Sequence, residues 1–122
     1  MKIRIKGNSV RYRLTRKDVA ALTNTGMIEE STAFGVNTFY YALKAKENIE
    51  TLEADFIGNR ITLYVPQSFV SGWEHNSIVG CDAQLQLSAT DSLYLLLEKD
   101  FACLDETHED QRDMYENPNK TC

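Results

Sequence analysis

This chain has no long run of apolar residues, whereas a membrane-spanning helix needs about 20 in succession. The first ten residues, MKIRIKGNSV, alternate charged and apolar side chains, whereas a secretory signal has a continuous apolar segment. Both features predict a cytoplasmic protein without a membrane partner.

Cysteine, histidine and glycine are also sparse. The three cysteines, Cys81, Cys103 and Cys122, do not resemble the disulfide framework of a small secreted protein, so we expect reduced thiols. The six glycines are scattered, and no phosphate-binding glycine-rich loop occurs. A Gly-x-Ser-x-Gly motif is absent, and His75 and His108 lack a recognisable catalytic partner spacing. These absences favour a non-enzymatic domain.

The composition is that of a globular protein. Hydrophobic residues make up 43% of the chain and charged residues 25%. A chain of 122 residues is long enough to bury one core but too short for two ordinary domains. From Asp105 the sequence becomes polar and acidic. We therefore expect one α+β domain over residues 1–104, with residues 105–122 as an acidic C-terminal segment packed on the same domain.

The first 14 residues predict a β-hairpin, because apolar and basic residues alternate on both sides of a Gly-Asn pair that suits a two-residue turn. With that turn, all large apolar side chains fall on one face. Four cations are then paired across the other face, Lys2 with Arg13 and Arg4 with Arg11. A one-residue slip would mix the two faces, which supports this register.

Further strands and two short helices follow. Strands are predicted over residues 27–32, 38–46, 52–57, 60–65, 83–87 and 93–101. Thr15 and Asp18 resemble a capping box that begins a helix, and Gly26 can end it. Phe69 and Trp73, four residues apart, predict one or two helical turns.

The arrangement predicts an α+β fold made mainly of antiparallel β-hairpins, with about seven strands and two short helices. The run Tyr94–Leu97 is apolar on both faces, which places its strand centrally in a sheet or against a helix. We expect a curled sheet or half-barrel with the helices covering one opening.

Three segments carry a resemblance to a known family: KIRIKGNSVRYRLT, LEADFIGNRITLYVP and EKDFACLDE, followed by Tyr-x-Asn-Pro near the end. Together they resemble a family of small uncharacterised bacterial proteins, a domain of unknown function found mainly in Bacteroidetes. The resemblance implies a stand-alone bacterial protein and a shared fold. It implies no activity, substrate or catalytic residue.

Charge is distributed unevenly along the chain. Residues 1–17 carry seven cations and no acid, whereas the chain as a whole has a net charge of -5. Like charges directly opposite each other in a hairpin are destabilising by about 0.2–1 kcal/mol per pair. The predicted pairs of Lys2, Arg4, Arg11 and Arg13 therefore need an explanation.

Two main explanations stand beside simple exposure of the four cations. Acidic residues of the same chain, the C-terminal segment above all, could cover them. Alternatively, they form a binding site for an anionic small molecule or an acidic protein, with forked arginine contacts. The acidic net charge and the lack of interleaved aromatics, apart from Tyr12 on the other face, argue against nucleic acid. Exposed strand edges also leave a homodimer open.

A weaker hypothesis is a zinc site made of Cys103, His108, Asp110 and Cys122, which supply nitrogen, sulfur and oxygen ligands. Their spacing matches no established zinc motif. The alternative is that Cys103 is a small core residue, His108 is solvated and Cys122 is a terminal residue without a role.

An enzymatic alternative is a phosphohydrolase resembling the triphosphate-tunnel enzymes. In that arrangement, the four cations would face acidic residues, with Mg²⁺ between acid and phosphate. The acids that could serve are Glu53, Asp55 and Glu98. The Glu-x-Glu-x-Lys motif of that class is absent from the first strand.

Overall fold

The computed structural model describes residues 1–102 and 113–116. This part of the chain contains eight strands and two helices. In chain order they are β1 (Lys2–Ile5), β2 (Ser9–Leu14), α1 (Arg16–Thr25), β3 (Met27–Ala33), β4 (Thr38–Lys46), β5 (Glu53–Ile57), β6 (Arg60–Pro66), α2 (Gln67–Val70), β7 (Gly80–Gln86) and β8 (Ser92–Lys99). The predicted α+β class is confirmed, and each of the predicted strand ranges corresponds to one of these strands.

Two four-stranded sheets of the same design make up the fold. The first sheet has the strand order β1-β2-β8-β7, and the second has the order β3-β4-β6-β5. Each contains two antiparallel hairpins that are joined through a parallel central pair, β2 with β8 and β4 with β6. Neither sheet closes on itself, so the expected curled sheet fits. The central position predicted for the 93–101 strand is also confirmed.

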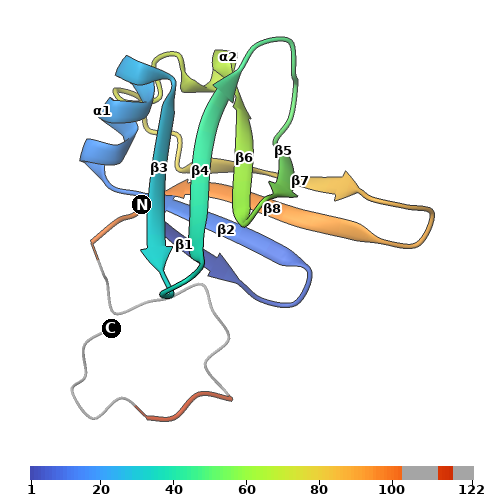
Figure 1. The fold of residues 1–122 in the computed structure, drawn as a ribbon. Helices are drawn as coiled ribbons and strands as arrows, with labels where there is room; N and C mark the ends of the chain where they lie inside the picture. Colours follow the sequence, from blue (N-terminus) through green and yellow to red (C-terminus); the bar gives the residue numbers. More distant parts are fainter. Residues whose placement is uncertain (103–112, 117–122) are drawn as a thin grey trace.

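The two sheets stack with their strands running across each other (Figure 1). Both helices lie at one end of the stack, where α1 contacts β2, β3 and β4 and α2 contacts β4 and β6. The tips of the β1–β2 and β7–β8 hairpins point away from the helices (Figure 1). Within the ranges given above, neither helix has the length and apolar character needed to cross a membrane.

The hairpin registers are those that the sequence predicts. Lys2 lies opposite Arg13 and Arg4 opposite Arg11, and Gly7 at the turn has a φ of 53°. At the tip of the β5–β6 hairpin, the consecutive residues Gly58 and Asn59 both have positive φ, as a type I′ turn requires. Alternation and turn chemistry therefore determine both hairpins.

Helix α1 begins and ends as predicted. The Asp18 N–H donates to the Thr15 hydroxyl at 3.3 Å, and the Thr15 N–H donates back to the Asp18 carboxylate at 2.9 Å, which completes a capping box. At the other end, Gly26 adopts a left-handed φ of 79° and donates to the Leu22 carbonyl at 2.8 Å. The residues flanking this helix thus satisfy one terminal N–H and one terminal carbonyl of its backbone.

The hydrophobic core lies between the sheets and is closed at one end by the helices. Its buried members are Val10, Tyr12, Leu14, Val19, Leu22, Leu43, Leu52, Leu63, Val65, Val70, Trp73, Leu95 and Leu97. Tyr12 is fully buried, and its hydroxyl donates to the Ile61 carbonyl at 3.2 Å, which links the first sheet to the second. Burial holds the pKa of Tyr12 well above its ordinary range.

Candidate functional site

Four cations form the basic face of the protein, which we define as Lys2, Arg4, Arg11 and Arg13. They lie on β1 and β2, whose side chains alternate between the core and the outer face of the first sheet. Tyr12, between Arg11 and Arg13, points into the core. The structure therefore brings together all four residues that the sequence predicts for an anion site.

Acidic residues at the end of β8 offset part of this charge. Arg13 Nε donates to Glu98 Oε1 at 2.8 Å, and Arg11 Nε lies 3.8 Å from the same oxygen. Lys2 Nζ lies 3.3 Å from Asp100 Oδ2. Arg4 and Arg11 make further interactions, so neither residue is without a partner.

The parallel pairing of β2 with β8 creates these contacts, since its register puts Glu98 directly beside Arg13. The Lys2 side chain is 75% exposed and that of Arg13 is 41% exposed. Ion pairs at this level of exposure contribute at most about 1 kcal/mol each. Lys2 and Arg4 are therefore exposed to solvent, and Arg11 and Arg13 are partly exposed.

The outer face of the first sheet changes character from one edge to the other. Next to β2, strand β8 presents Leu96 beside Arg11 and Tyr94 beside Ser9. On β7, Asp82 accepts a hydrogen bond from the Tyr94 hydroxyl at 2.8 Å, and this bond raises the pKa of Tyr94, with burial adding to it. Cations thus occupy one half of the face, and an aromatic, an aliphatic and an acidic side chain occupy the other.

The structure does not bring Glu53 and Asp55 to the basic face. Both lie on the outer side of the second sheet, where Lys46 Nζ is 3.3 Å from Glu53 and the Tyr64 hydroxyl donates to Asp55 at 2.8 Å. Of the three acids in the proposed tunnel arrangement, only Glu98 contacts the cations.

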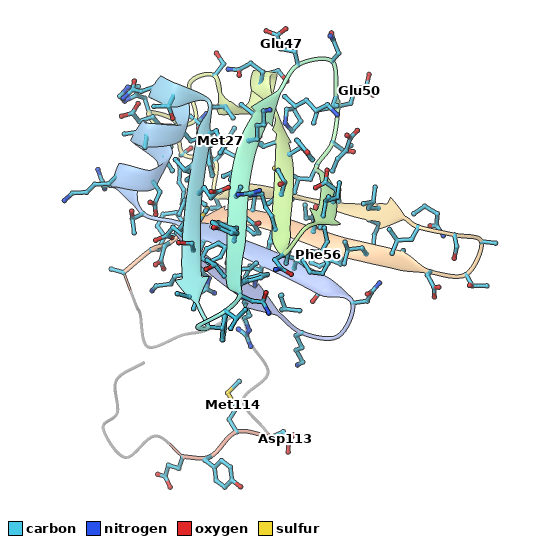
Figure 2. The ribbon with its side chains drawn as sticks, viewed as in Figure 1. Met27, Glu47, Glu50, Phe56, Asp113 and Met114 are labelled. Carbon is cyan, nitrogen blue, oxygen red and sulfur yellow. The ribbon has the colours of Figure 1, made fainter. Side chains whose placement is uncertain are left out.

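The outer side of the second sheet has a polar network of its own. Figure 2 looks onto this side, with Met27 on β3 at one edge and Phe56 on β5 at the other. Arg60 Nε donates to Glu29 Oε2 at 2.7 Å, and its guanidinium lies 4.5 Å from the centre of the Tyr40 ring. The charged side chains on this side are therefore largely engaged in contacts within the sheet.

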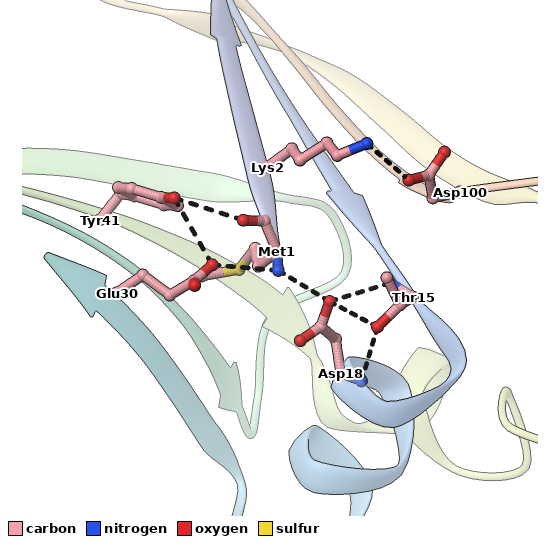
Figure 3. Close-up of polar contacts among 7 residues, drawn as sticks. All are labelled: Met1, Lys2, Thr15, Asp18, Glu30, Tyr41 and Asp100. Atoms are coloured by element: carbon pink, nitrogen blue, oxygen red, sulfur yellow. Dashed lines mark hydrogen bonds and ion pairs between the residues drawn. The ribbon is translucent and has the colours of Figure 1, made fainter. Parts of the chain in front are cut away.

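The chain start forms a second polar cluster, which the sequence did not reveal (Figure 3). The Met1 ammonium lies 2.8 Å from Asp18 Oδ2 and 3.0 Å from Glu30 Oε2, and the Tyr41 hydroxyl donates to the Met1 carbonyl at 3.3 Å. Burial favours the neutral amine, but hydrogen bonds and charges of the two carboxylates outweigh it and raise the Met1 pKa. Burial is likewise outweighed at Asp18, whose pKa is lowered by the ammonium and by Thr15.

A cavity of about 290 Å³ lies where α2, the 50–52 loop and β7 meet. It is lined by Glu50, Thr51, Leu52, Pro66, Ser68, Phe69, Cys81 and Asp82. Burial, followed by the charge of Asp82, raises the pKa of the Cys81 thiol to about 11. The thiol is therefore protonated at neutral pH and is a poor nucleophile.

A family model described as a family of unknown function, DUF7009, matches residues 1–119. The chain belongs to this family. No curated protein matches it, and no solved structure does. The resemblance noted in the sequence is confirmed at the level of the DUF7009 family, whose description carries no activity.

The zinc site predicted for this DUF7009 chain cannot be located, because its four residues lie outside the described part. They are Cys103, His108, Asp110 and Cys122. Across residues 1–102 and 113–116, no three His, Cys, Asp or Glu side chains are grouped so that they could hold a metal ion. The four residues of the basic face, in contrast, all lie within the described part of the chain.

Proposed function

We propose that this protein is a non-enzymatic binding domain whose basic face binds an anionic small molecule or an acidic partner protein. The supporting observation is the hairpin register, in which Lys2 lies opposite Arg13 and Arg4 opposite Arg11 on an accessible face. Each like-charge pair costs about 0.2–1 kcal/mol. Glu98 and Asp100 offset part of that cost, and a bound anion would offset more of it. The proposal includes the bacterial, cytoplasmic setting implied by the resemblance and the sequence.

The chemistry of the four side chains suits phosphate and carboxylate groups. Arginine presents a planar fork of donors that can engage two oxygens of either group, and Arg4 and Arg11 face each other across the hairpin. Because the face is exposed, its attraction for anions should weaken strongly as salt is added.

The test is a binding titration at low salt with phosphate, a nucleoside triphosphate, an oligonucleotide and polyglutamate. The variant is Arg4→Glu/Arg11→Glu, which keeps like charges opposite each other while reversing their sign. The matched control is Lys44→Glu on β4, an exposed position of the second sheet.

We expect the double variant to lose at least about tenfold in affinity for the anion that binds wild type, corresponding to about 1.4 kcal/mol. Lys44→Glu should change that affinity by less than about twofold, because the change in net charge is half as large and lies on the other sheet. The proposal is wrong if no anion alters either binding signal or melting temperature, or if the control loses as much affinity as the double variant.

A further inference from the structure

We infer that the partner is an acidic segment of another protein, which adds to the first sheet as an extra strand along β1. This inference rests on the proposed function and specifies the ligand class for the same site. Its evidence is the position of β1 at the edge of the sheet, the direction of its backbone groups and the alternation of its side chains.

Strand β1 has a hydrogen-bonded neighbour on one side only within the described residues. The Lys6 N–H donates to the Ser9 carbonyl at 3.2 Å, so this pair is of the hydrogen-bonded kind. Such pairs alternate along an antiparallel hairpin, which directs the backbone groups of Lys2 and Arg4 toward β2. The N–H and C=O groups of Ile3 and Ile5 therefore point outward from the sheet edge, as a template for another strand.

The side chains of β1 define what that strand must carry. In an antiparallel partner, the residue opposite Arg4 would be in a non-hydrogen-bonded pair, with Cα atoms about 4.5 Å apart and side chains on the basic face. A carboxylate there would meet the guanidinium. Residues opposite Ile3 and Ile5 would lie on the other face, where Ile5 is 56% exposed and Ile3 is partly buried. The matching segment alternates acidic and apolar residues.

Charge excludes a second copy of β1 as the natural occupant. Two β1 strands pairing antiparallel about Arg4 would place Arg4 opposite Arg4 and Lys2 opposite Lys6. Cations on an edge strand are a common protection against such self-pairing. The same cations attract an acidic strand, so the edge selects for a partner of opposite charge.

The probe is a labelled synthetic peptide of alternating glutamate and valine, measured against a peptide of the same composition with all glutamates in one block. We expect the alternating peptide to bind the full chain at least about tenfold more tightly than the block peptide. N-methylation of the alternating peptide at every second residue, along its bonding edge, should abolish this preference because it removes the backbone donors.

On the protein, Ile5→Pro removes one outward N–H, a position at which an edge strand tolerates proline. Ile5→Val is the matched control, since it keeps the N–H and the apolar side chain. We expect at least about tenfold weaker binding for Ile5→Pro and less than about twofold change for Ile5→Val. The N-methylated peptide decides the question on wild-type protein if Ile5→Pro lowers the melting temperature strongly.

The outcomes separate this inference from the proposed function. Equal binding of the alternating, block and N-methylated peptides would mean that the basic face binds anions without strand addition, so only the inference would fail. Absence of binding by every peptide and every anion would overturn both. A dimer that forms without peptide and dissociates in Ile5→Pro would show that a second copy occupies the edge, which also overturns the inference.

Discussion

The α-ammonium of Met1 lies 2.8 Å from Oδ2 of Asp18, and the same carboxylate completes the capping box of α1. The Asp18 side chain therefore connects the residue before β1 to the first turn of the helix. Glu30 of β3 holds the ammonium from the second sheet at 3.0 Å. This cluster joins three elements and positions the first residues of the basic face.

Asp18→Asn should lower the free energy of unfolding by about 1–3 kcal/mol, since it removes a charge-assisted hydrogen bond and weakens the helix cap. Glu30→Gln is the matched control and should cost less, because the Glu30 side chain is 47% exposed and that of Asp18 is 23% exposed. Urea denaturation of both variants measures the difference. Equal losses would show that the link to the helix cap adds nothing.

The pH dependence of stability follows from the same pair. The pKa of Met1 is raised above 8.0, so its contribution is complete below pH 8.0 and disappears as the pH rises through the folded-state value. The pKa of Asp18 is lowered below 3.8, so its contribution is complete above pH 3.8 and disappears as the pH falls through the folded-state value. Urea denaturation at several pH values should show both losses, and Asp18→Asn should flatten them. An unchanged pH profile in that variant would contradict this account.

Glu98→Gln should strengthen anion binding by about two- to tenfold at low salt, because it removes the carboxylate that contacts Arg11 and Arg13. The accompanying loss of stability should be about 1 kcal/mol, because the pair is partly buried, with the Glu98 side chain 19% exposed and that of Arg13 41% exposed. Glu53→Gln on the second sheet is the control for a change in net charge alone. Equal strengthening by both variants would show that the local contact is irrelevant to binding.

Cys81 should react slowly with iodoacetamide in the native protein. With its pKa at about 11, compared with an ordinary value of 9.0, the thiolate fraction at pH 9 is about fiftyfold lower than for a free thiol. Peptide mapping by mass spectrometry after a short reaction measures this, with urea-unfolded protein as the reference. Equal rates in the native and unfolded protein would show that burial does not protect the thiol.

Local rules were sufficient to predict the hairpins and the cap of α1. In the first hairpin, slipping the register by one residue would move Ile3 and Ile5 to the outer face, so alternation and the turn together specify which cations oppose each other. The composition of the basic face could therefore be read before any tertiary contact was known. Thr15, Asp18 and Gly26 specify the helix ends in the same way, because capping depends on neighbours three or four residues apart.

The surroundings of the basic face could not be predicted. Arg13 and Glu98 are 85 positions apart, and they meet because β2 and β8 pair in parallel within the first sheet. All four strands of the second sheet lie between β2 and β8 in the sequence. Leu96 is an apolar residue on the outer face of β8, and this pattern predicted a central position for the strand. The pattern did not indicate that β2 would be its neighbour. Parallel pairing leaves no turn in the sequence to mark it, so its register depends on packing of the complete core.

The sequence by itself determined the secondary structure, the two hairpin registers and the identity of the four clustered cations, since each follows from side-chain period and turn geometry over a few residues. Only the tertiary structure decided that Glu98 and Asp100 lie against those cations and that, among the described residues, β1 is an edge strand. It also decided that Asp18 and Glu30 hold the Met1 ammonium. These contacts join residues far apart in the chain, and burial of a common core, which no local pattern encodes, brings them together.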